Sequence, residues 1–135
     1  MSYSANLLIR SGMRGAKPAA IDRLFHQKGP AAAATYAPDR TYREPPAIGE
    51  HIVSLAEAHG VDAYMMAAQI AKESAWWQST IVRDKHNPSG LGAENDDPYN
   101  KAITFRSPYD GIRATLAHLL SYALGDENPL RQYSV

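Results

Sequence analysis

Apolar residues recur three and four positions apart in four stretches of the chain, which is the spacing of amphipathic helices. The first helix is predicted over 18–28, because Pro18 suits a first helical position and Gly29 suits a stop. The second is predicted from Pro46 to Gly60, with its apolar residues on one face. Those residues are Ile48, Ile52, Leu55 and Ala56.

The third and fourth helices have clear start signals. Asp62 is a candidate N-cap for a helix over 63–75, which is apolar nearly all round and is therefore expected to be central and buried. Ser107 can cap a last helix that begins at Pro108 and that Gly125 ends. The pattern indicates a mostly α (α+β) domain.

Two segments lack helical periodicity. Residues 29–46 hold four prolines and an alanine run, and they are predicted to connect a small N-terminal helix to the main body. Residues 84–104 are rich in turn formers, and a loop this long in a compact domain is usually functional. Short strands near 90–94 and 101–105 would make a small hairpin there.

The composition of the chain excludes several kinds of functional site and partner. The 135 residues suggest one domain, and the absence of cysteine excludes disulfides, thiolate zinc sites and a cysteine nucleophile. Fourteen basic and 14 acidic residues balance, which argues against nucleic acid as a partner. No apolar run reaches the roughly 20 residues of a membrane span, and residues 1–10 do not read as a secretory signal peptide.

Glu73 is the residue that ordinary packing explains least, because it is a carboxylate in the last turn of the most apolar helix. Burial and the negative end of the helix dipole both disfavour its charged form. Such a site suits a carboxylic acid that stays protonated near neutral pH, as a general acid for a glycosidic oxygen must. The alternative is a residue at the helix rim that pairs with Lys72, Arg83 or Lys85.

Two neighbouring features are candidate ligand contacts. Consecutive helical residues point about 100° apart, so Trp76 and Trp77 cannot easily bury against one surface. One of them is expected to line a groove as a platform for sugar rings, although both could instead be core residues. The run 86–92 forms a tight turn around Asn87 that can present backbone groups to a ligand.

Three motifs occur in a characteristic order: AQIAKES at 68–74, NPSGLG at 87–92 and FRSPYDGIR at 105–113. Together they resemble the bacterial and phage glucosaminidase family of peptidoglycan hydrolases, glycoside hydrolase family 73 and its relatives. The resemblance covers about residues 45–125. It implies a lysozyme-like fold, hydrolysis of the β-1,4 linkage after N-acetylglucosamine, and Glu73 as the catalytic acid.

The resemblance departs from the family pattern at two places. The family often has glycine two residues after the catalytic glutamate, where this chain has Ala75. Family members also differ in the second carboxylate, which commonly comes from the interval between the asparagine turn and the phenylalanine motif. Glu94 is favoured there over Asp96 and Asp97, which read as turn residues, and the alternative is that all three are solvated loop charges.

Other groups complete the expected site. A tyrosine, Tyr109 or Tyr122, could stabilise the oxocarbenium-like transition state in place of a second carboxylate. With Gln69, Trp76, Trp77 and Asn87, these tyrosines are the expected substrate contacts. The five histidines lack the four-apart spacing of a zinc-protease helix, so neither a metal nor another cofactor is expected.

The sequence thus predicts a single catalytic domain over 1–135 that cleaves peptidoglycan glycan strands. Residues 1–44 are assigned to the N-terminal helix and its connection, 45–125 to the core, and 126–135 to a tail or the start of a linker. The chain is expected to be a monomer at the bacterial cell wall, as a phage endolysin, a virion-associated lysin or part of a modular secreted autolysin. The alternatives are a muramidase, a lytic transglycosylase, or a non-catalytic wall-binding or virion module.

Overall fold

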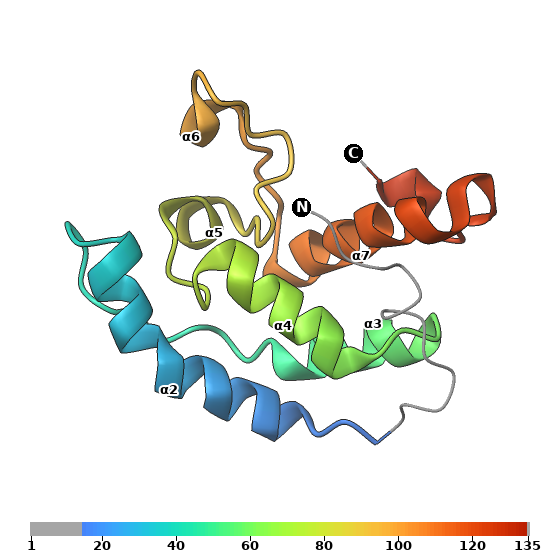
Figure 1. Ribbon diagram of the computed structural model, residues 1–135, viewed down its shortest axis with the longest axis horizontal. Helices are drawn as coiled ribbons and strands as arrows, with labels where there is room; N and C mark the ends of the chain where they lie inside the picture. Colours follow the sequence, from blue (N-terminus) through green and yellow to red (C-terminus); the bar gives the residue numbers. More distant parts are fainter. Residues whose placement is uncertain (1–14, 135) are drawn as a thin grey trace.

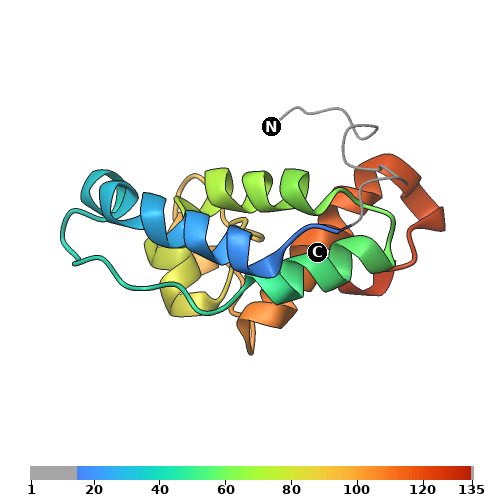
Figure 2. The same ribbon diagram turned by 90° about the horizontal axis from the view of Figure 1, so that it is seen from below.

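Helix α3 (Gly49–Ala58) packs against α2 (Pro18–Tyr36), α4 (Ala63–Ser74) and α7 (Pro108–Leu124). The computed structural model describes residues 15–134, so the predicted absence of a secretory signal in residues 1–10 falls outside the described part. Figure 1 shows α4 between α2 and α7, and the view from below shows α2 and α3 along that side of the molecule (Figure 2). The mostly helical, lysozyme-like fold class is confirmed.

One apolar core joins these four helices. Its largest fully buried side chains come from every one of them, and they exclude water from the space between α2, α3, α4 and α7. They are Phe25, Ile48, Ile52, Met66, Ile70, Ile112, Leu116 and Leu120. In the part of the chain that the structure describes, no helix has the length and apolar character to cross a membrane.

Helix α2 is longer than the sequence predicted. It continues through Gly29 and Pro30 to Tyr36, so the expected stop at Gly29 is wrong. A Cβ atom on residue 29 would lie 2.4 Å from the Tyr42 ring, which indicates that glycine serves close packing here. The alanine run that follows Pro30 has the highest helix propensity, which favours continuation despite the lost backbone hydrogen bond.

The predicted caps of α4 and α7 are confirmed. The Asp62 carboxylate accepts hydrogen bonds from the backbone N–H groups of Tyr64 and Met65. The Ser107 hydroxyl accepts from the N–H of Asp110, with Pro108 in the first turn. The expected burial of α4 all round is wrong, because Tyr64 and Met65 lie on an exposed face.

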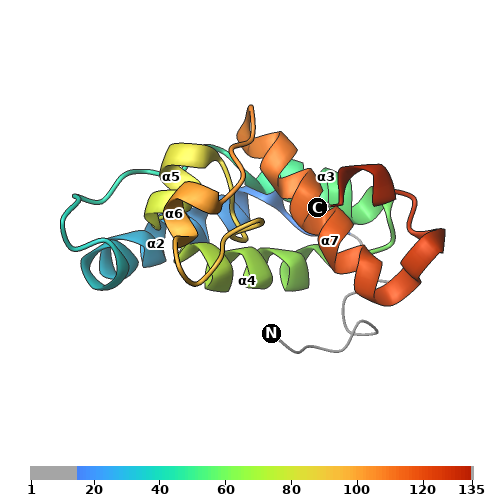
Figure 3. The ribbon, with the colours of Figure 1, turned by 90° about the horizontal axis from the view of Figure 1, so that it is seen from above.

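The segment between α4 and α7 forms two short helices. These are α5 (Thr80–Lys85) and α6 (Pro98–Lys101), and residues 86–104 contain no strand, so the predicted hairpin does not form. Asp97 caps α6 and Pro98 occupies its first position, which favours a helical turn between the two expected strands, at 90–94 and 101–105. Figure 1 shows α5 beside the C-terminal end of α4 and α6 farther from it, and the view from above shows both short helices to one side of α7 (Figure 3).

Residues 125–134 fold against α7, although a tail was expected there. The 3-10 helices η1 (Gly125–Glu127) and η2 (Arg131–Tyr133) both contact α7. The buried Asn128 side chain donates to the carbonyl of Ala117 at 2.9 Å, and its own carbonyl oxygen accepts from the N–H of Leu130. This asparagine fastens the segment to the helix, which a pattern of apolar positions does not reveal.

Candidate active site

An open groove of about 300 Å³ runs between α4, the turn after Asn87 and α7. Its walls come from three segments that are far apart in the sequence and that carry the three motifs recognised above. Gln69 and Glu73 belong to α4, and Thr115, His118, Leu119 and Tyr122 to α7. Ser89, Gly90, Leu91 and Gly92 form the remaining wall.

Glu73 is exposed at this groove, so its predicted burial is wrong. The side chain lies on the open side of α4, while the core face of that helix is made by residues such as Ile70 and Ala71. Gln69, one turn earlier, donates from Nε2 to Oε1 of Glu73 at 2.8 Å. The carboxyl is therefore accessible to a substrate and is held by a neighbour on the same helix.

The buried side chain of Asn87 holds the backbone of the turn that follows it. Its side chain is buried, and Nδ2 donates to the carbonyls of Leu91 and Ile103, at 3.0 and 2.9 Å. Its Oδ1 accepts from the N–H of Leu91 at 3.0 Å. Both donors of the amide are thus used within the loop, so Asn87 positions the groove wall, and the substrate contact expected of it stays a prediction.

A second contact ties the turn to α7. The hydroxyls of Ser89 and Thr115 lie 2.8 Å apart, and Thr115 donates to the carbonyl of Gly111 one turn earlier. Thr115 is buried and Ser89 is half-buried, so this pair closes the base of the groove. Gly92 completes the turn with a φ of 82°, a left-handed conformation that glycine adopts without steric cost.

The two tryptophans lie away from the groove. Ala75, Trp76 and Trp77 all have left-handed φ values, of 51°, 56° and 67°, which end α4 and turn the chain sharply. Trp76 then packs edge-on against Phe25, with ring centroids 5.1 Å apart, and Trp77 is 3% exposed. Neither is among the groove-lining residues, so the structure does not support a sugar platform beside Glu73.

The left-handed run begins where the related family often has glycine. Ala75 takes φ 51° and ψ 55°, a conformation that costs a residue with a Cβ roughly 1 kcal/mol or more. Ser74 offsets part of this cost, because its hydroxyl accepts from the N–H of Trp77 at 3.0 Å and donates to the carbonyl of Ile70. The departure from glycine is therefore accommodated without loss of the turn.

Of the two candidate tyrosines, the groove contains only Tyr122. Tyr122 is 70% exposed and packs edge-on against His118, whose Nε2 is 3.4 Å from the tyrosine hydroxyl. Tyr109 instead packs against His51 and under the Arg113 guanidinium. Thr115 and His118 also line the groove but were not expected from the sequence, although their spacing with Tyr122 places all three on one side of α7.

The loop acids lie outside the groove lining. Glu94 and Asp96 both accept from the Lys101 ammonium, at 3.0 and 2.8 Å, and both are exposed. Asp97 caps α6 by accepting from the N–H of Asn100. Glu73 is the one carboxylate among the described residues that line the groove. A catalytic role for Glu94 therefore stays a prediction.

An ion pair between Arg40 and Asp84 connects α5 to the segments around it. Arg40 binds Asp84 through two nitrogens, at 2.8 and 2.9 Å, and the Tyr99 hydroxyl donates to the same carboxylate at 2.8 Å. These hydrogen bonds, the Arg40 bond first, lower the pKa of Asp84 from 3.8 to about 2, against the opposing effect of burial. The pair joins the segment after α2 to α5 and α6.

A mostly helical domain whose helices and turn enclose a groove with an accessible glutamate is a lysozyme-like arrangement. A sequence model of the glucosaminidase family, described as mannosyl-glycoprotein endo-beta-N-acetylglucosaminidase, matches residues 49–134, more than half of the chain. The chain belongs to the glucosaminidase family of peptidoglycan hydrolases, and it is a glycoside hydrolase that acts on peptidoglycan. A comparison with curated protein sequences found no match.

Metal ligands do not gather in the described part of the chain. Within residues 15–134, no three histidine, aspartate or glutamate side chains are grouped so that they could hold a metal ion. The groove itself offers three hydroxyls, an amide, one imidazole and one carboxyl beside its apolar residues. This set can donate and accept hydrogen bonds along a sugar chain and can supply one acid.

Proposed function

We propose that the protein cleaves the β-1,4 bond after N-acetylglucosamine in the glycan strands of peptidoglycan, with Glu73 as general acid. The observation that supports this most is the position of Glu73, the one carboxylate among the described residues that line the groove between α4, the turn after Asn87 and α7. A glycosidic oxygen that leaves must be protonated in the transition state, and a positioned carboxylic acid can do this. Membership of the family supports the same substrate class.

The accessible position of Glu73 suits an open polymer substrate. A glycan strand can lie along the groove without threading, with its hydroxyl and amide groups toward Gln69, Ser89 and His118. Gln69 restricts the carboxyl through the 2.8 Å hydrogen bond, and so favours one orientation toward the glycosidic oxygen. In this proposal Gln69 is a positioning residue and Glu73 is the catalytic residue.

The second group of the reaction is proposed to be Tyr122. Its hydroxyl belongs to the groove and faces the same space as Glu73, whereas Glu94 is paired with Lys101 outside the lining. A phenolic oxygen can stabilise the positive charge that develops on the sugar ring. Water would then complete hydrolysis.

A lytic transglycosylase is the second candidate function. The observation that favours it is the single carboxylate in the groove lining, because intramolecular attack by a substrate hydroxyl dispenses with a second carboxylate that activates water. Both candidates use Glu73 as the acid. They differ in the chemical end that they leave on the glycan.

The deciding experiment is mass spectrometry of fragments released from purified peptidoglycan. Reducing N-acetylglucosamine ends are the expected product. Anhydro-muramyl ends would replace the proposal with transglycosylation, and reducing N-acetylmuramic acid ends would replace it with a muramidase. Tight binding to the wall without any released sugar would indicate a non-catalytic module.

A further inference from the structure

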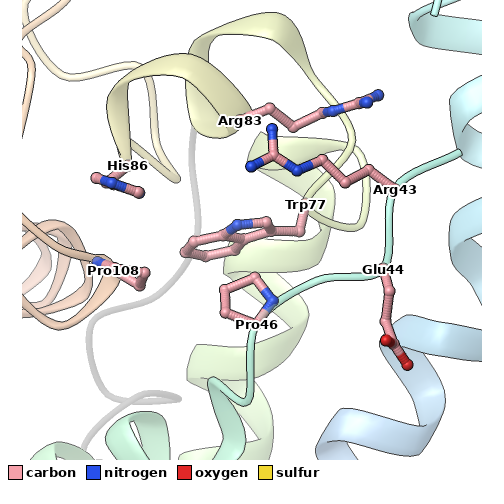
Figure 4. Close-up of a pocket in the computed structure, with 7 residues that line it drawn as sticks. All are labelled: Arg43, Glu44, Pro46, Trp77, Arg83, His86 and Pro108. Atoms are coloured by element: carbon pink, nitrogen blue, oxygen red, sulfur yellow. The ribbon is translucent and has the colours of Figure 1, made fainter. Parts of the chain in front are cut away.

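A second pocket of about 230 Å³ lies on the far side of the turn that ends α4. Its lining includes two guanidinium groups, an indole, an imidazole and two proline rings, and it shares no residue with the Glu73 groove. The residues are Arg43, Arg83, Trp77, His86, Pro46 and Pro108 (Figure 4). The chemistry described so far uses none of them.

Arg83 gives this pocket its first unexplained feature. Its Nε and Nη1 atoms are buried, and neither has a hydrogen-bond partner among the described residues. Buried N–H groups of a charged side chain are costly to leave unpaired, so native structures that contain them usually supply a ligand, an ion or water. Burial lowers the pKa of Arg83, and the positive charges of Arg40 and Arg43 lower it further.

Arg43 adds a second cation to the pocket, and hydrogen bonds hold its backbone in place. The N–H of Arg43 donates to Oε1 of Gln78 at 3.1 Å, and Nε2 of the fully buried Gln78 donates back to the Arg43 carbonyl at 2.6 Å. Figure 4 shows the Arg43 side chain reaching across one side of the Trp77 indole, with Pro46 on the other side. Arg83 lies beyond Arg43 in the same view.

The two nearby acids, Asp84 and Glu44, form their ion pairs with other residues, although the charge of Asp84 partly offsets the lowered pKa of Arg83. Asp84 is held by Arg40 through two hydrogen bonds and by Tyr99 through a third. Glu44 belongs to the pocket rim, but its side chain is 74% exposed, turns away in Figure 4 and lies 3.7 Å from His26. Two guanidinium charges therefore remain together beside an apolar wall.

We propose that this pocket binds a phosphate group carried on a small organic molecule or on a polymer. Guanidinium groups match the geometry of phosphate oxygens, and a phosphate with a charge near −2 can neutralise both arginines, whereas a monocarboxylate can neutralise one. The Pro46 and Pro108 rings would pack against the carrier. This inference does not depend on the reaction at Glu73.

The test is calorimetric titration of the full chain with inorganic phosphate, dimethyl phosphate and acetate at constant ionic strength. We expect saturable phosphate binding that Arg83→Gln and Arg43→Gln each weaken at least about tenfold. Arg23→Gln, which removes the same charge from an exposed site on α2, should leave binding unchanged. The indole N–H signal of Trp77, followed by NMR, should shift with phosphate in the parent protein.

Each outcome decides the proposal. Acetate binding as tight as phosphate would overturn the phosphate assignment, and weaker dimethyl phosphate binding would identify a terminal phosphate as the preferred form of the ligand. Phosphate binding that survives both pocket substitutions would indicate an adventitious ion only and would overturn the site. The absence of saturable phosphate binding would overturn it as well. If Arg83→Gln fails to fold, the exposed Arg43→Gln still gives the answer, because its backbone contacts to Gln78 do not involve the replaced side chain.

Discussion

Glu73 accepts a hydrogen bond on Oε1 from Nε2 of Gln69, one turn earlier on α4, at 2.8 Å. Both side chains line the groove between α4, the turn after Asn87 and α7. The bond restricts the carboxyl while leaving it accessible from solvent. Glu73 is thus an exposed carboxyl held by a hydrogen bond, and not the buried acid that the apolar character of α4 had indicated.

The first prediction concerns Glu73→Gln. The amide keeps the shape of the side chain and removes the proton donor, so release of sugar from peptidoglycan should fall at least about a hundredfold. Because Glu73 is exposed, the free energy of unfolding should change by less than about 0.5 kcal/mol. Reducing-end assays and urea denaturation check the two expectations. Glu50→Gln, an exposed change on α3, is the control that should keep full activity.

The second prediction separates the two candidates for the second group. Tyr122→Phe removes the hydroxyl that faces the groove, and kcat should fall about tenfold or more while KM changes little. Tyr109→Phe should have no comparable effect, because Tyr109 packs against His51 and Arg113 away from the groove. Steady-state kinetics on soluble glycan fragments give both constants.

Substitutions of the three loop acids test the alternative, in which the second catalytic group is a carboxylate. Glu94→Gln, Asp96→Asn and Asp97→Asn should each leave kcat within about twofold, since none of these residues lines the groove. A large loss of turnover in Glu94→Gln alone, with Tyr122→Phe fully active, would return the role of second group to Glu94.

Local signals in the sequence were sufficient to predict where α4 and α7, the two helices that line the groove, begin. Asp62 and Ser107 each place a short acceptor before an apolar period, and the structure shows both side chains accepting from backbone N–H groups of the helix that follows. The order of the three motifs also brought Glu73, Ser89 and the start of α7 into one expected site. The two caps depend on neighbours within a few residues, which is why a single sequence shows them, whereas the joint site was implied by the resemblance that the three motifs carry.

Other features depend on contacts that a local pattern does not contain. The stop expected at Gly29 overlooked Tyr42, whose ring needs the space that glycine leaves. The positions of Trp76 and Trp77 follow from three successive left-handed residues without any glycine to mark them. The exposure of Glu73 follows from where the distant turn and α7 pack, because those elements decide which side of α4 stays open.

The third prediction concerns the buried amide of Asn87. Asn87→Ala removes three hydrogen bonds and leaves the Leu91 N–H and the Ile103 carbonyl without these partners, while the Leu91 carbonyl keeps the Ile103 N–H, so stability should fall by about 2 kcal/mol. Activity should fall with it, because Leu91 belongs to the groove wall. Asn95→Ala, an exposed change in the same loop, should leave both properties unchanged. Urea denaturation and sugar release provide the measurements.

The fourth prediction is a pH dependence of stability at Asp84. Its pKa is about 2 in the folded protein against 3.8 as the reference, so the ion pair contributes fully above pH 3.8 and is lost as the pH falls through about 2. Asp84→Asn should therefore lower stability at pH 7 by about 1 kcal/mol, a value reduced from the full shift because the pair is partly solvent-screened. The difference from the parent protein should shrink below pH 3.8 and be mostly lost near pH 2, whereas Asp39→Asn, at an exposed position, should show no difference at either pH. Urea denaturation between pH 2 and pH 7 tests the slope, and a constant difference across that range would show that the asparagine acts through packing and not through the lost charge.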